Sequence, residues 1–184
     1  MVYVFLAEGF EEIEALTPVD LLRRAGVAVK TVSIDETSNI VVGARGISVN
    51  ADITISEVEY DTAELIVLPG GMPGTINLTK CDSLMSKVDE YAKSGDVCKR
   101  VAAICAAPSK ILGERGLLNG KKATCYPGME GGMSGATAVT DSVVTDGNIT
   151  TSRGMGTAVD FAVELVALIC GKEKASEIRN SAVA

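Results

Sequence analysis

The residue with the clearest chemical potential is Cys105, which stands between an apolar segment, residues 101–104, and Ala106-Ala107-Pro108. Small neighbours fit the sharp strand-to-helix turn of a nucleophile elbow, and Pro108 suits the first turn of a helix. Free N–H groups and the dipole at a helix N-terminus favour a thiolate. These residues predict a reactive cysteine at a crowded bend; a buried structural cysteine is the alternative.

Three carboxyl groups at the start of another predicted helix could serve the same chemistry. Glu11, Glu12 and Glu14 complement the positive end of the helix dipole, which is their ordinary role. A carboxyl group that turned back toward the strand ends, beside a thiolate, would have its pKa raised by burial and by like charge. It could then donate a hydrogen bond or exchange a proton. The spacing does not choose among the three.

Two glycine-rich segments follow or precede predicted elements. Pro69-Gly70-Gly71 ends the apolar run 65–68, and paired glycines can present backbone N–H groups to an anion. The alternative is a loop that requires positive φ. Gly154-Met155-Gly156 precedes the last predicted helix; it could cradle an anion, but we favour a helix cap.

The chain has no histidine, which removes several kinds of catalytic and metal site. A Ser-His-Asp or Cys-His pair cannot form within this chain, nor can a zinc site built on histidine. The five cysteines include no C-x-x-C pair, so a disulfide framework or a four-thiolate metal site has little support. Cys125 could approach Cys105 as a resolving thiol, although a small core residue is the favoured interpretation.

Composition excludes further classes of protein. The 17 basic and 24 acidic residues give a net charge of −7, which disfavours binding to nucleic-acid phosphates. No apolar run reaches the roughly 18 residues of a membrane span. The apolar N-terminus lacks the basic flank of a signal peptide, so we expect a cytoplasmic protein with reduced thiols. No phosphate-binding glycine motif is present, so no cofactor is expected.

The elements that must position these residues alternate along the chain. The apolar strands predict a parallel sheet buried between helices. In such sheets ligands gather at the carboxyl ends of the strands, here residues 7–14, 69–74 and 104–108. We expect strands at 2–6, 27–34, 65–68 and 101–104, hairpin-like stretches at 40–49 and 139–151, and helices at 11–25, 82–93, 107–113 and 157–171.

Several segments together resemble the ThiJ/PfpI superfamily, and within it the branch of the Parkinsonism-associated deglycase. The resemblance implies a flavodoxin-like, three-layer α/β sandwich with a mostly parallel central sheet, formed by residues 1–184 as one domain, and a homodimer. The matching segments, in the family's order, are residues 7–14, 18–26, 67–71, 102–108 and 151–157.

The resemblance also assigns roles to particular residues. Cys105 matches the family's nucleophilic, oxidation-prone cysteine, and Glu14 matches the carboxyl group that hydrogen-bonds the sulfur. Gly71 and Ala106 match the backbone N–H donors around it, and Gly70 belongs to the same pocket loop.

Other positions match the surroundings of the pocket. Arg24 and Arg45 fall where the family has basic residues near the dimer-facing side. Tyr126, in Thr124-Cys125-Tyr126-Pro127, replaces the histidine that several members carry in a Thr-His-Pro segment, and Cys125 lies beside it on the far wall.

The function implied is a cysteine-dependent, cofactor-independent enzyme that acts on small reactive dicarbonyls or glycated substrates, either a glyoxalase or a deglycase. Peptidase activity is disfavoured because Ala106 follows the cysteine where peptidase members have histidine, and a glutamine amidotransferase would need a Cys-His-Glu set. The alternatives are a redox-responsive protein, in which Cys105 is oxidised to sulfinate, or a chaperone-like stress protein. No metal site is expected.

Overall fold

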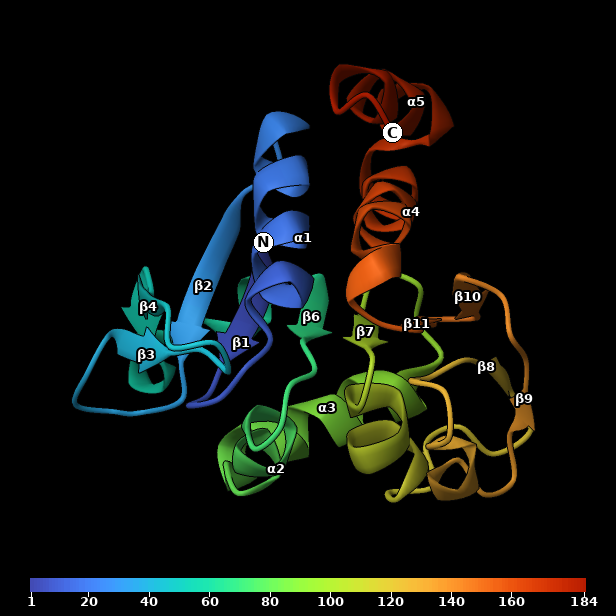
Figure 1. The fold of residues 1–184 in the computed structure, drawn as a ribbon, viewed down its shortest axis with the longest axis horizontal. Helices are drawn as coiled ribbons and strands as arrows, with labels where there is room; N and C mark the ends of the chain where they lie inside the picture. The colour runs from blue at the N-terminus through green and yellow to red at the C-terminus, as the bar shows by residue number, and fades with distance from the viewer.

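A seven-stranded sheet separates two layers of helices in the computed structural model, which describes residues 1–184 (Figure 1). The strand order is β10-β11-β7-β6-β1-β2-β5, and every neighbouring pair is parallel except β10 and β11. The strands of this sheet are β1 (Val2–Leu6), β2 (Val29–Ser33), β5 (Ile53–Thr54), β6 (Leu65–Leu68), β7 (Arg100–Ile104), β10 (Val143–Asp146) and β11 (Ile149–Ser152).

Two small two-stranded sheets lie outside the central sheet. β3 (Ile40–Val42) and β4 (Ser48–Asn50) form an antiparallel hairpin. β8 (Lys122–Ala123) and β9 (Thr137–Ala138) pair in parallel. The hairpin predicted within residues 40–49 is therefore confirmed.

The helices cover both faces of the sheet. In Figure 1, α1 and α4 lie on one face, and α2 and α3 lie on the other. The helices are α1 (Glu12–Arg24), α2 (Gly74–Thr79), α3 (Asp82–Ser94), α4 (Ala158–Cys170) and α5 (Lys172–Ser181), with a short π-helical turn at Pro108–Gly113.

Strand β1 shows why the sheet has a core on each face. All five of its residues are buried. Tyr3 and Phe5 pack into the core under α3, whereas Val4 and Leu6 pack into the core under α1 and α4. A strand that is apolar on both faces is stable only between two covering layers, as the sequence predicts. The three-layer α/β architecture is confirmed.

Two helices and one helix type differ from the predictions. The prediction includes neither α2 nor α5; α2 has six residues, and α5 buries only Ala175 and Ile178, too few to display a helical period. The helix expected at 107–113 is present at Pro108–Gly113, but it is a π-helical turn instead of an α-helix. No helix combines the length and apolar character that crossing a membrane requires.

Candidate active site

Cys105 lies directly after β7 in a left-handed backbone conformation, with φ of 66°. Few non-glycine residues adopt this region, and those that do cluster at functional sites. The Cys105 N–H donates to the Ser152 carbonyl at 2.9 Å, and the Cys105 carbonyl accepts from the Tyr126 N–H at 2.8 Å. Neighbouring segments thus hold the bend from both sides. The crowded turn that the small neighbours of Cys105 predict is confirmed.

Glu14, in the first turn of α1, is the acid that turns toward the sulfur. Glu14 is 1% exposed, and its carboxyl group hydrogen-bonds the Cys105 side chain. Glu14 Oε2 also accepts the Gly70 N–H at 3.0 Å, and the Met155 N–H donates to the same carboxyl group. Strands β1, β6 and β7 are neighbours at the centre of the sheet (Figure 1), so the loops after them meet at this point.

The other two acids of the cluster face the hairpin turn between β3 and β4. Glu12 Oε1 accepts the Arg45 N–H at 2.8 Å. Glu11 Oε2 lies 3.9 Å from the Arg45 guanidinium, which is largely exposed. The structure therefore distinguishes three carboxyl groups that spacing alone leaves equivalent.

Gly70 is required by the close approach of the reactive pair. A Cβ atom at this position would overlap Glu14 Oε2 and would lie 2.7 Å from Cys105 Cβ and 3.1 Å from the sulfur. At Gly71, φ is 93° and a Cβ atom would overlap the Glu11 backbone nitrogen. The pair of glycines thus lets the backbone pass directly beside the sulfur, where the Gly71 and Ala106 N–H groups hydrogen-bond it.

Burial raises the pKa of both reactive groups. Desolvation raises the pKa of Glu14 to about 7, and the nearby negative charge of Glu11 adds to the effect. Desolvation also raises the pKa of the Cys105 thiol to about 12, with the Glu14 carboxylate as the second cause. The raised pKa of Glu14 agrees with the prediction for a buried carboxyl group.

The free thiolate predicted from the helix N-terminus is wrong. The segment after Cys105 is a single short π-helical turn, and the nearest charge to the sulfur is a carboxylate. Between pH values of about 7 and about 12 the pair holds one proton and one negative charge. The sulfur is therefore ionised only while Glu14 carries that proton.

A cavity of about 370 Å³ opens above this pair. Arg45 and Tyr126 line it, as expected from the sequence. Three methionines also line it, and no sequence pattern indicates them because methionine is an ordinary core residue. The lining residues are Glu11, Glu14, Ala44, Arg45, Gly71, Met72, Cys105, Ala106, Tyr126, Met129 and Met155.

Arg24 and Cys125 do not line the cavity within this chain. Arg24 pairs with Asp20 at 2.8 Å near the far end of α1, ten residues from Glu14 and so about 15 Å along the helix. Cys125 is 2% exposed and packs in the core beneath α3. Burial raises the pKa of its thiol to about 11, as expected for a core cysteine. The Gly154-Met155-Gly156 segment forms a short 3₁₀ turn that leads into α4, and its Met155 N–H donates to the Glu14 carboxyl group.

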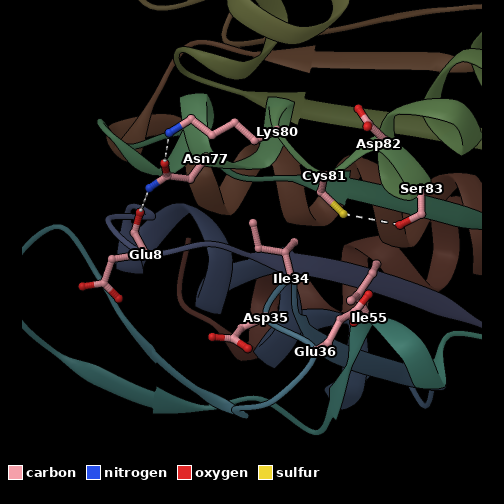
Figure 2. Close-up of a pocket in the computed structure, with 10 residues that line it drawn as sticks. All are labelled: Glu8, Ile34, Asp35, Glu36, Ile55, Asn77, Lys80, Cys81, Asp82 and Ser83. Carbon is pink, nitrogen blue, oxygen red and sulfur yellow. Dashed lines mark hydrogen bonds between the residues drawn. The ribbon is translucent and has the colours of Figure 1, made fainter.

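A larger cavity, of about 680 Å³, lies beside the links after β1 and β2 and between α2 and α3 (Figure 2). There the Asn77 amide donates to the Glu8 carbonyl and accepts from Lys80, both at 2.9 Å, and Cys81 lies 3.4 Å from the Ser83 hydroxyl. The two cavities share no lining residue. We place the chemistry in the smaller one because only it contains the paired thiol and carboxyl. The larger is lined by Glu8, Ile34, Asp35, Glu36, Ile55, Asn77, Lys80, Cys81, Asp82 and Ser83.

No group of three or more histidine, cysteine, aspartate or glutamate side chains is arranged to bind a metal ion.

A family model described as "DJ-1/PfpI family" matches residues 1–168. The chain belongs to the DJ-1/PfpI family. The resemblance drawn from the motifs is therefore confirmed.

Relatives within this family match nearly the whole chain. Protein DJ-1 homolog B of Arabidopsis thaliana is 42% identical over 96% of the chain, although the chain spans only 40% of that relative. Glutathione-independent glyoxalase DJR-1.2 of Caenorhabditis elegans is 31% identical over 93% of the chain and 89% of the relative. The solved structure of oxidized Toxoplasma gondii DJ-1 superposes with a TM-score of 0.92, at 36% identity over 99% of this chain and 97% of that one.

Proposed function

We propose that this protein is a cofactor-independent enzyme that converts small 2-oxoaldehydes into 2-hydroxy acids, with Cys105 as nucleophile and Glu14 as general acid and base. The observation that carries the proposal is the buried, hydrogen-bonded pair of the Cys105 thiol and the Glu14 carboxyl group beneath an open cavity. A relative named as a glutathione-independent glyoxalase, 31% identical, supports the same chemistry.

The reaction begins with attack of the Cys105 sulfur on the aldehyde carbon, while Glu14 holds the proton of the thiol. Glu14 then gives this proton to the carbonyl oxygen, which forms a hemithioacetal and leaves Glu14 as the carboxylate. Glu14, as carboxylate, then removes the hydrogen from the former aldehyde carbon and returns a proton to the adjacent carbon, which gives a thioester. Water hydrolyses the thioester, releases the 2-hydroxy acid and restores the thiol. A pKa of about 7 suits Glu14 to transfer protons in both directions near neutral pH.

The Gly71 and Ala106 N–H groups already contact the sulfur, so they are close to the oxygen that becomes negative when the sulfur adds to the aldehyde. One such donor typically contributes about 3 kcal/mol to the transition state. The same attack on an early adduct between a dicarbonyl and a protein amine would remove the adduct, which is deglycation.

The test is production of lactate from methylglyoxal by the wild-type protein, Cys105→Ala and Glu14→Gln. We expect both variants to lose at least a hundredfold in kcat/KM, because each removes one member of the pair. Cys81→Ser is the matched control, since Cys81 is a partly buried thiol in the other cavity. Full lactate production by Cys105→Ala would overturn the proposal.

A second function, redox response at Cys105, is favoured by the N–H and carboxyl donors around the sulfur, which would stabilise a sulfinate. Cys98 and Cys170 provide internal controls because both are exposed. Mass spectrometry after mild peroxide treatment should find Cys105 oxidised before them. Earlier oxidation of the exposed thiols would remove the basis for this function.

We also propose that the protein is a cytoplasmic homodimer, as the family resemblance implies. The exposed apolar residues Ile13 and Ile47 lie on α1 and in the β3–β4 hairpin, beside the elements that carry Glu14 and Arg45. Sedimentation equilibrium at micromolar concentration should give twice the chain mass of 19.1 kDa; a single-chain mass would exclude a stable dimer.

A further inference from the structure

Large apolar and aromatic side chains gather at the mouth of the Cys105 cavity. Met72, Tyr126 and Met155 line it and are 54%, 51% and 58% exposed. Only eight large hydrophobic side chains are exposed in the whole molecule, and these three surround one opening. Concentrated exposure of this kind marks a surface that binds something apolar. Met129 completes the group, which we call the methionine wall.

The backbone fixes the methionine wall relative to the reactive pair. Met72 follows Gly71, whose N–H contacts the sulfur. The Tyr126 N–H donates to the Cys105 carbonyl at 2.8 Å, and the Met129 N–H donates to the Tyr126 carbonyl at 3.0 Å. The Met155 N–H donates to Glu14. These backbone contacts hold the methionine wall next to Cys105 and Glu14. The flexible methionine side chains can adapt to substituents of different shape.

The cavity is larger than a three-carbon substrate needs. Methylglyoxal has five non-hydrogen atoms, which would occupy about 150 Å³ even if each took the roughly 30 Å³ of a water molecule. The cavity measures about 370 Å³. On the same basis, the ten non-hydrogen atoms of phenylglyoxal would occupy about 300 Å³ and would fit.

The charges of the cavity disfavour an acidic substituent. Glu11 and Glu14 face it, and Arg45, the one basic lining residue, lies 3.9 Å from Glu11. An anionic group would meet two carboxyl groups and a guanidinium that is already paired. The lining therefore suits a neutral, apolar substituent.

We propose that the methionine wall is a specificity subsite for the substituent of a 2-oxoaldehyde, so that aryl and longer alkyl glyoxals are better substrates than methylglyoxal. This inference rests on the proposed function and names the substrate class of the same site. The preferred reaction adds water to phenylglyoxal and gives mandelate. The aldehyde carbon is oxidised to the acid and the ketone carbon is reduced to the alcohol, so no external oxidant or reductant is needed.

The experiment compares kcat/KM for phenylglyoxal and methylglyoxal, from initial rates of mandelate and lactate formation. Wild type should prefer phenylglyoxal about tenfold, within the range that hydrophobic pockets achieve. Met72→Gln and Met155→Gln keep the length of the side chain but make it polar, and each should lower that ratio about fivefold or more. Val97→Gln is the control, because Val97 is 55% exposed and lines a different cavity; it should leave the ratio unchanged.

The outcomes separate the two proposals. Turnover of both substrates with no preference for phenylglyoxal would overturn the subsite and leave the proposed function intact. A preference that survives both glutamine variants would also overturn the subsite. No turnover of either substrate would overturn the proposed function, and the subsite with it.

Discussion

At the scale of residues, the reactive pair depends on contacts from segments far apart in the chain. The residue types around Cys105 predict its bend, which the φ of 66° confirms. The choice of Glu14 among three acids, and the raised pKa of the thiol, could not be predicted from spacing. They depend on burial beside Gly70, 56 residues from Glu14, and on the Met155 N–H.

The buried carboxyl of Glu14 should make stability depend on pH. In the folded protein its pKa is about 7, above the ordinary value of 4.5. The folded state therefore binds the proton more tightly than the unfolded state, and stability falls as pH rises from about 4.5 to about 7. The loss is about 3 kcal/mol, since one pKa unit corresponds to about 1.4 kcal/mol. Glu14→Gln removes this titration. In urea unfolding, the free energy of unfolding of the variant minus that of wild type should therefore be about 3 kcal/mol larger at pH 8 than at pH 4.

Glu36→Gln, at an exposed position, should show no such pH-dependent difference. If the gap between Glu14→Gln and wild type were the same at both pH values, Glu14 would not carry the raised pKa.

At the scale of elements, local patterns predict the longer strands and helices, but neither the two-residue strands β5, β8 and β9 nor how the elements meet. The strand predicted at 2–6 has the same bounds as β1. The acids and arginines used to predict the ends of α1 lie in its first and last turns. The contact between the β3–β4 turn and the start of α1 is different. It depends on Gly43 and Glu12, which no local period relates, and it brings Arg45 to the cavity.

Gly43→Ala should separate this hairpin from α1. A Cβ atom at Gly43 would overlap the Glu12 carboxyl group and lie 2.6 Å from its Cγ, so the Arg45 N–H would lose its 2.8 Å bond to Glu12. We expect a loss of about 1–3 kcal/mol in stability and a higher KM for methylglyoxal with a smaller change in kcat. Gly131→Ala, where a Cβ atom meets nothing within 4 Å, is the control. An unchanged KM in Gly43→Ala would show that the hairpin does not shape the cavity.

At the scale of the whole molecule, one sheet separates two cores, and the proposed chemistry lies at the carboxyl ends of its central strands. The family match ends at residue 168, before α5. α5 packs on α4 through the buried Ala175 and Ile178, with an ion pair from Arg179 to Asp160. Figure 1 shows α5 beyond α4, away from the ends of β1, β6 and β7. We therefore expect substitutions in α5 to change stability without changing the proposed chemistry.

Ile178→Ala should test that separation. Ile178 is 4% exposed in the core shared with α1 and α4, and truncation of a buried isoleucine costs about 2–5 kcal/mol. We expect a lower Tm by calorimetry and an unchanged kcat/KM per folded molecule at 25 °C. A selective loss of activity in the folded variant would mean that α5 influences the cavity.

The most direct measurement of the shared proton is the pH profile of kcat/KM for methylglyoxal. For wild type we expect the value to rise tenfold per pH unit below about 7 and to level off above it, because the pair gains its negative charge as Glu14 titrates. Glu14→Gln should lose both the activity and the transition near pH 7. A wild-type profile that is flat from pH 5 to 9, or a Glu14→Gln variant that keeps the same transition, would contradict a catalytic pair of Cys105 and Glu14.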